Sequence, residues 1–181
     1  MVGAMNSNVR RGITVLVALV SSVAGWGKVI YVDTDAPGAN DGTIWENAYN
    51  FLQDALTDAN SSEKPAEIRV GQGVYTPDSN SAVPSGTGDR AATFQLLNNV
   101  SLTGGYAGYG GAEPDARDVN EYETILSGDL DGNDVELGEA WLWWHQGREP
   151  SRIDNSYHVV TGSYTDSSAK LAGFTITSGV T

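Results

Sequence analysis

The stretch with the clearest capacity for chemistry is "SGDLDGND", in which oxygen-bearing side chains crowd one turn. These side chains are Asp129, Asp131, Asn133 and Asp134. Calcium is a hard cation that takes about six to eight oxygen ligands, and closely spaced carboxylates and amides after a strand can supply them. The pattern predicts a calcium site, and the alternative is an acidic turn that binds no ion.

This turn differs from the calcium loop of EF-hand proteins. Asp129, Asp131 and Asn133 fit the first three ligand positions of that loop. Asp134 stands where the loop needs glycine, and Ala140 stands where it needs a bidentate glutamate. The turn is therefore not an EF-hand, and the predicted metal ligands are the four side chains of the turn itself.

A second candidate is the stretch "EAWLWWHQGREPSR", in which three tryptophans crowd an otherwise polar segment. If exposed, the indoles of Trp141, Trp143 and Trp144 could stack on sugar rings. The alternative is a loop or short helical turn that folds its indoles back onto the body of the protein. His145, which follows them, has no partner visible in the sequence. The three tryptophans are our candidate carbohydrate-binding residues.

The sequence offers little support for catalysis. It contains no G-x-S-x-G elbow, no H-E-x-x-H motif and no phosphate-binding loop. Its two histidines, His145 and His158, leave little room for a histidine-based site, and His158 fits the expected strand "SYHVV". We assign no catalytic residue.

The composition is that of a folded, acidic chain without cysteine. Its 181 residues give room for one domain or for the opening part of a repetitive one. The formal net charge is −13, and residues 1–24 hold two arginines and no acid, so the remainder carries −15. Such a surface repels nucleic acid and anionic lipid and attracts divalent cations. The lack of cysteine excludes disulfides and thiolate metal sites.

The N-terminus has the layout of a secretory signal peptide. Arg10 and Arg11 precede an apolar run over residues 13–20, and the small-x-small triplet Ser22-Val23-Ala24 follows. A transmembrane anchor would need about 20 apolar residues. We therefore expect residues 1–24 to be removed on export, a mature part without a transmembrane helix, and a secreted, extracellular or outer-membrane surface location.

One amphipathic helix is predicted in "TIWENAYNFLQDALTDAN", from Thr43 to about Asn60. Thr43 and Glu46 form a capping box at its start. Apolar residues recur at helical spacing on one face: Trp45, Ala48, Tyr49, Leu52, Ala55, Leu56 and Ala59. We expect this face to cover the end of a β-structure.

The rest of the chain predicts short strands between glycine- and aspartate-rich turns. The expected strands are "KVIYVD", "EIRVG", "GVYTP", "ATFQLL", "VSLTGGY", "ETILSG", "YHVVTGS" and "KLAGFTIT". Three share a rough phrase of alternating apolar residues followed by glycine: "VSLTGGY", "TILSGD" and "LAGFTIT". They suggest one repeat with inserted loops, and an ordinary β-sandwich is the alternative on periodicity alone.

The order of these phrases resembles the N-terminal part of secreted right-handed parallel β-helix proteins of the pectin-lyase-like superfamily. The opening "YVDTDAPGANDGTIWENAYNFLQDAL" and the late "GFTIT" are the most specific parts, and the Gly-Gly phrases are similar to those of polymorphic outer-membrane-protein repeats. Thr177 departs from the latter, which have asparagine there in a Phe-x-x-Asn phrase.

The resemblance implies an all-β fold: a right-handed parallel β-helix, or single-stranded solenoid, with one N-terminal capping α-helix. Residues 28–181 would form its N-terminal capped portion. The ending "LAGFTITSGVT" has no cap after Leu171, Phe174 and Ile176. We therefore expect that the solenoid is truncated at its C-terminus and continues beyond residue 181.

The function expected from these features is a structural, adhesive or carbohydrate-binding role outside the cell. Its partners would be an extracellular polysaccharide or a cell-surface component, with calcium as the one expected cofactor and no nucleic acid. The alternative is the N-terminal part of a polysaccharide lyase or glycoside hydrolase whose catalytic coils lie beyond residue 181. Polysaccharide lyases of this superfamily bind calcium through aspartates, but a shared fold does not by itself imply activity.

Overall fold

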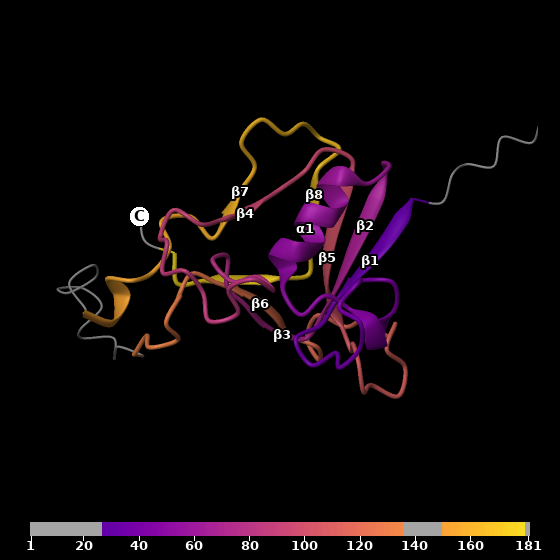
Figure 1. The fold of residues 1–181 in the computed structure, drawn as a ribbon, viewed down its shortest axis with the longest axis horizontal. Coiled ribbons are helices and arrows are strands. Elements are labelled where there is room, and N and C mark those ends of the chain that lie inside the picture. The colour runs from indigo at the N-terminus through magenta and orange to yellow at the C-terminus, as the bar shows by residue number, and fades with distance from the viewer. Residues whose placement is uncertain (1–26, 136–149, 180–181) are drawn as a thin grey trace, which may run out of the picture.

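A computed structural model describes residues 27–135 and 150–179 (Figure 1). Its strands are β1 (Lys28–Val32), β2 (Ala66–Gly71), β3 (Gly73–Tyr75), β4 (Phe94–Gln95), β5 (Val100–Tyr106), β6 (Thr124–Ser127), β7 (Val160–Thr161), β8 (Lys170–Ala172) and β9 (Thr175–Thr177). Its helices are α1 (Leu52–Ser61) and two 3-10 turns, η1 (Trp45–Asn47) and η2 (Pro150–Arg152).

The strands form three separate sheets in the described part of the chain, and every strand pairing is parallel. The first sheet has the order β1-β2-β5-β8, the second β3-β6-β9 and the third β4-β7. Figure 1 shows the first sheet beside α1, with β3 and β6 running across its lower end. Between β2 and β5, and again between β5 and β8, the chain passes through the second and third sheets, so these paired strands lie far apart in sequence.

The first sheet is held in register by a row of aliphatic side chains. Ile30 of β1 pairs with Ile68 of β2, which pairs with Leu102 of β5. Leu102 pairs in turn with Leu171 of β8. The first three are buried, and Leu171 is partly buried against them. Since a slip of one residue would turn every side chain to the opposite face, burial of this row fixes the pairing.

All three sheets and the helix share one hydrophobic core. Leu126 of β6 and Phe94 of β4 are fully buried beside the first sheet's row. The helix α1 contacts β1, β2 and β4. It buries one face, which consists of Leu52, Ala55, Leu56 and Ala59. Helical spacing places these four residues on a single stripe, so the helix closes one side of the core.

The predicted fold class is wrong. We expected an all-β, right-handed parallel β-helix, a continuous solenoid with one capping helix. The described residues form three small parallel sheets of four, three and two strands, with 12% helix and 28% strand. The third sheet pairs over only two residues of each strand, and long turn-rich segments such as 76–93 and 107–123 separate the strands. In those segments side chains and local turns satisfy much of the backbone, so the ladders do not continue.

The predicted strand positions are largely confirmed. The strands β1, β2, β3, β5 and β6 lie within or nearly coincide with the predicted stretches. The stretch "YHVVTGS" keeps only Val160–Thr161 as β7. The stretch "KLAGFTIT" is divided at Gly173, whose φ of 80° turns the chain from β8 in the first sheet to β9 in the second.

The predicted helix is shorter than expected. Residues Trp45–Asn47 form a 3-10 turn, and α1 begins at Leu52 after an extended Phe51. The backbone of Tyr49 donates to Tyr31 O and accepts from Asp33 N, which are β1 contacts that a helix could not make. The expected capping box is absent because Thr43 bonds to Asp41. Within residues 27–135 and 150–179, no helix has the length and apolar character needed to cross a membrane.

A buried carboxylate ties the end of β1 to a loop that follows β5. Asp33 is 3% exposed and accepts hydrogen bonds from Asp35 N at 2.9 Å and Tyr109 N at 2.8 Å. Burial raises the pKa of Asp33, and the two backbone bonds act in the opposite direction. Gly108, with φ of 75°, passes so close that a β-carbon there would collide with the carboxylate of Asp33.

Ile68→Ala should lower the free energy of unfolding by about 2–5 kcal/mol, because it opens a cavity in the aliphatic row. Ile44→Ala is the matched control, since Ile44 is 50% exposed and should change the free energy by no more than about 0.5 kcal/mol. Urea denaturation measures both. Equal losses would contradict the placement of Ile68 in the core.

Gly108→Ala should destabilise the protein more than Gly110→Ala does. Both glycines have positive φ, 75° and 84°, so each substitution carries a backbone cost of about 1–2 kcal/mol. Only position 108 adds a collision with Asp33, whereas no atom lies within 4 Å of a β-carbon at position 110. Urea denaturation of the two variants isolates the collision, and equal losses would show that Asp33 is not tightly held.

Candidate functional site

The predicted acidic turn follows β6 and is held by its first aspartate. Asp129 Oδ1 accepts a hydrogen bond from Asn133 N, and its Oδ2 accepts one from Asp134 N, each at 3.0 Å. Asp129 and Asp134 are half-buried, whereas Asp131 and Asn133 are exposed. Both carboxylate oxygens of Asp129 therefore serve the backbone of the turn.

A second segment, far along the chain, packs against this turn. Asn133 Nδ2 donates to Asp154 Oδ2 at 3.0 Å, and Asn155 Nδ2 donates to Asp134 Oδ2 at 2.9 Å. The backbone joins them as well, since Ser156 N donates to the carbonyl of Gly128 at 2.8 Å. We use the term acidic site for the side chains that meet here, which are Asp129, Asp131, Asn133, Asp134, Asp154 and Asn155.

Electrostatic repulsion acts within the acidic site. The charge of Asp154 raises the pKa of Asp131, with further contributions from desolvation and from hydrogen bonding to Asp154. The more distant carboxylates of Asp129 and Asp78 act in the same direction. Asp131 is therefore repelled by the carboxylates around it, and a cation would relieve that repulsion.

In the part of the chain that the structure describes, no three His, Cys, Asp or Glu side chains stand in an arrangement that could hold a metal ion. The donors that meet at the acidic site are carboxylate and amide oxygens, which suit a hard cation. Any ion there would have to draw on amide oxygens as well as carboxylates.

Beside the acidic site an aromatic side chain stands partly in solvent. Tyr157 is 50% exposed, and the guanidinium carbon of Arg90 lies 4.4 Å from the centre of its ring. Arg90 is itself fixed, because its Nε donates to Asn155 O at 2.7 Å. Its backbone carbonyl accepts from Tyr157 N at 2.8 Å. A cation over one face of a ring favours that stacking, so the tyrosine is positioned from one side.

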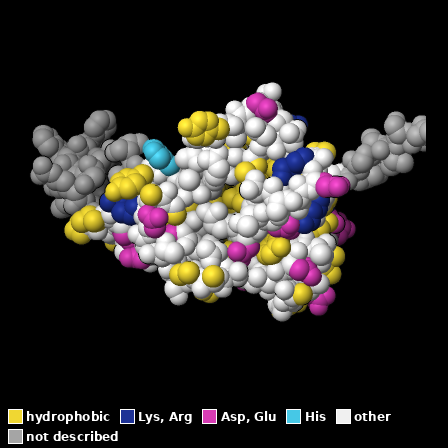
Figure 2. All heavy atoms as spheres, turned by 45° about the horizontal axis from the view of Figure 1, so that its top comes forward, with side chains coloured by type: hydrophobic (Ala, Val, Ile, Leu, Met, Phe, Trp, Pro, Cys, Tyr) yellow, Lys and Arg dark blue, Asp and Glu magenta, His cyan; other side chains and the backbone are white. Residues whose placement is uncertain are grey.

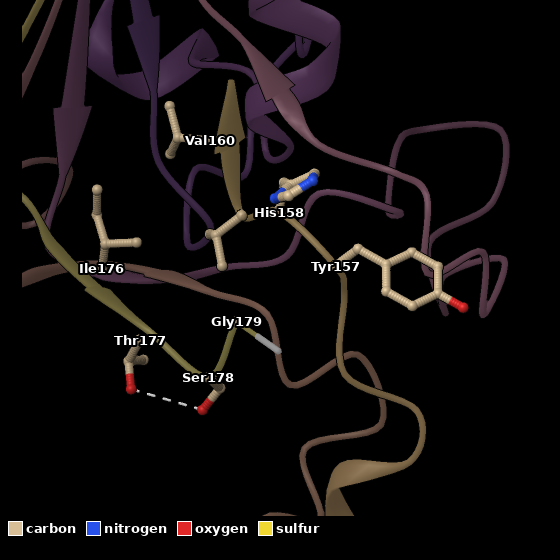
Figure 3. A pocket seen from close by; sticks show the side chains of 8 residues that line it. Tyr157, His158, Val160, Ile176, Thr177, Ser178 and Gly179 are labelled. Carbon is tan, nitrogen blue, oxygen red and sulfur yellow. Dashed lines mark hydrogen bonds between the residues drawn. The ribbon is translucent and has the colours of Figure 1, made fainter. Parts of the chain in front are cut away.

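A shallow hollow of about 530 Å³ lies next to this tyrosine (Figure 3). Its lining comes from the segment before and within β7 and from β9 with the residues after it: Tyr157, His158, Val159, Val160, Ile176, Thr177, Ser178 and Gly179. Figure 3 shows the hydroxyls of Thr177 and Ser178 together on one wall, with the ring of Tyr157 projecting outward on the other side. The hollow thus combines apolar side chains with hydroxyls and one imidazole.

The surface around these features is polar rather than continuously apolar. On the face shown in Figure 2, hydrophobic side chains stand in small separate groups among uncharged and acidic ones. Tyr157 and Tyr164 are among the exposed large side chains of the described residues. Separate aromatic residues on a polar surface suit contacts with sugars better than with an apolar partner.

The predicted site residues divide into two groups. The structure brings Asn133 and Asp134 into contact with the second segment, and Asp129 serves as the scaffold of the turn. Trp141, Trp143 and Trp144, together with His145, lie outside the described residues. His158 is exposed two residues before β7 and lines the hollow, rather than lying within the strand as predicted.

Sequence reasoning missed Asp154, Asn155 and Arg90. The first two follow the acidic turn by about twenty positions, and no spacing rule connects the two segments. The adjacent pair of acidic and amide residues before the strand "SYHVV" was the available signal, since such pairs mark turns with free oxygens. Arg90 lies in a glycine- and aspartate-rich segment and carries no signal of its own.

Comparisons with known proteins do not connect the chain to a family. No family model, curated protein or solved structure matches it. The resemblance read from the sequence therefore stays a prediction, and no residue role is transferred from another protein.

Asp154→Asn should lower the pKa of Asp131 toward its ordinary range, because it removes the charge that most strongly raises that pKa. Titration of the carboxyl carbons by NMR measures the change. The pKa of Asp41, held low mainly by a hydrogen bond from the Thr43 side chain, is the internal control and should not move. An unchanged pKa of Asp131 would show that the two carboxylates are not close.

Proposed function

We propose that this protein is an exported structural and adhesive module that binds carbohydrate. The observation that carries the proposal is the hollow next to Tyr157, whose lining includes hydroxyl groups, an imidazole and the half-exposed Tyr157. Sugars present hydroxyl groups and apolar ring faces together, and aromatic rings with one apolar face and a polar edge match both.

The position of Tyr157 supports this role. Arg90 covers one face of its ring, and backbone bonds fix both residues. A rigid aromatic side chain loses little conformational entropy when a ligand stacks on it. The hydroxyls of Thr177 and Ser178, which lie 3.5 Å apart, can each donate and accept toward a sugar hydroxyl.

Export is part of the proposal and rests on the sequence. The leader pattern of residues 1–24 and the acidic charge of the rest favour a place outside the cell, where glycans are accessible. Trp141, Trp143 and Trp144, which lie in the sequence between the two segments of the acidic site, are proposed to add further stacking contacts.

Tyr157→Ala should weaken glycan binding several-fold, because the loss of one stacking contact removes about 1 kcal/mol. The triple variant Trp141→Ala, Trp143→Ala and Trp144→Ala should weaken it further. A glycan array identifies a ligand, and titration calorimetry with that ligand compares the variants. Tyr164→Ala is the matched control, because Tyr164 is fully exposed outside the hollow and should not matter.

Two results would contradict the proposal. One is an array on which the unaltered protein binds no glycan. The other is fractionation that finds the mature protein retained in the cytosol, because the proposed ligands are extracellular.

A further inference from the structure

The acidic site contains buried oxygen atoms that lack a hydrogen-bond donor. Among the described residues, Asp134 Oδ1, Asp154 Oδ1 and Asn155 Oδ1 are all buried without a partner. Asn155 is 1% exposed as a whole residue, so bulk solvent does not reach its side chain. A buried polar atom left unsatisfied costs about 1–3 kcal/mol, and three of them in one place require an explanation.

The amide of Asn155 is directed into the acidic site. Its Nδ2 bonds to Asp134 Oδ2, so the amide group lies against that carboxylate. The free oxygens of the two residues therefore belong to one small region. Asp154 adds a third free oxygen from the adjacent position, and its other oxygen is held by Asn133.

We propose that the acidic site binds one calcium ion between the two segments, through Asp134, Asp154 and Asn155. These residues supply two carboxylates and one amide oxygen, which is the hard oxygen set that calcium prefers. Asp131 is exposed and is not among the proposed ligands. Asp129 stays the scaffold of the turn, because both of its carboxylate oxygens already accept backbone bonds.

This ligand set differs from the one predicted from sequence. The sequence placed all the ligands in one turn, at Asp129, Asp131, Asn133 and Asp134. In the structure Asn133 uses its side chain to hold Asp154 and is not a ligand. Two of the three proposed ligands come from the second segment, so calcium would join two stretches that are about twenty residues apart.

One protein group offers a different source of positive charge. Arg152, in η2, carries a buried Nε that also lacks a partner. No salt bridge of Arg152 is found within the described residues. If Arg152 neutralised the acidic site by itself, no charge repulsion would remain for calcium to relieve. The experiment must distinguish neutralisation by Arg152 from neutralisation by calcium.

The test uses the full chain, freed of metal with EDTA, with calcium chloride as the probe. Titration calorimetry should give one site with a dissociation constant of about 0.1–1 mM, as in extracellular calcium modules. At ten times that constant, mass action multiplies the folding equilibrium constant about elevenfold and raises the unfolding temperature by a few degrees. Magnesium at the same concentration should give a smaller shift, because it demands near-octahedral geometry and dehydrates reluctantly.

Two variants and one control locate the site. Asp154→Asn keeps an acceptor for Asn133 but removes a ligand charge, so it should abolish the calcium-induced shift. Asn155→Asp should lower the unfolding temperature without calcium and enlarge the shift with it, because it adds both repulsion and a ligand charge. Asp35→Asn, an identical change at an exposed aspartate after β1, should leave the shift intact.

Three outcomes would overturn the proposal. The first is that the unaltered protein shows neither heat of binding nor a shift in unfolding temperature at about ten millimolar calcium, well above the usual range for such modules. The second is that calcium shifts the unfolding temperature of Asp154→Asn as much as that of the unaltered protein. The third is that the unfolding temperature of Asn155→Asp responds to calcium no more than that of the unaltered protein. If the unaltered protein does not respond to calcium and Arg152→Gln lowers the unfolding temperature, Arg152 is the group that neutralises the acidic site. None depends on glycan binding, so failure here is distinguishable from failure of the carbohydrate proposal.

Discussion

The structure depends on parallel, in-register stacking of one aliphatic row. Ile30, Ile68 and Leu102 come from three strands that are distant in sequence, and their burial fixes which backbone groups meet across the first sheet. The helix and the other two sheets place Leu56, Phe94 and Leu126 against the same row. Because parallel strands cannot be joined by tight hairpins, every return to this row requires a long connection. The loops that carry the candidate sites are a direct consequence.

Repulsion between like charges opposes folding at one place in the structure, the acidic site. The acidic site gathers four carboxylates, and repulsion from Asp154 raises the pKa of Asp131. Asp33 presents a contrasting solution, since a buried carboxylate can be held by two backbone N–H groups. At Asp33 the protein supplies all the donors. At Asp134 and Asp154 it leaves acceptor oxygens free.

The sequence predicted local features better than the arrangement in space. Alternating apolar residues between glycine and aspartate turns located most strands, because that pattern reflects local geometry. The helix was predicted too long because the backbone of Tyr49 pairs with β1, a distant contact that overrides helical propensity. The β-helix class failed because similar strand phrases do not determine how far each ladder continues. The acidic turn was found, but Asp154 and Asn155 were not, since spacing carries no information about a second segment.

The hydrogen bonds between the two segments of the acidic site affect how readily the connection between these segments can be lengthened. Side-chain and backbone hydrogen bonds join residues 128–134 to residues 154–156. The two ends of the connection between β6 and β7 are therefore held together by these bonds. Lengthening a connection whose ends are already fixed costs little free energy. The stretch is a natural place at which to graft a foreign peptide for display without altering the sheets.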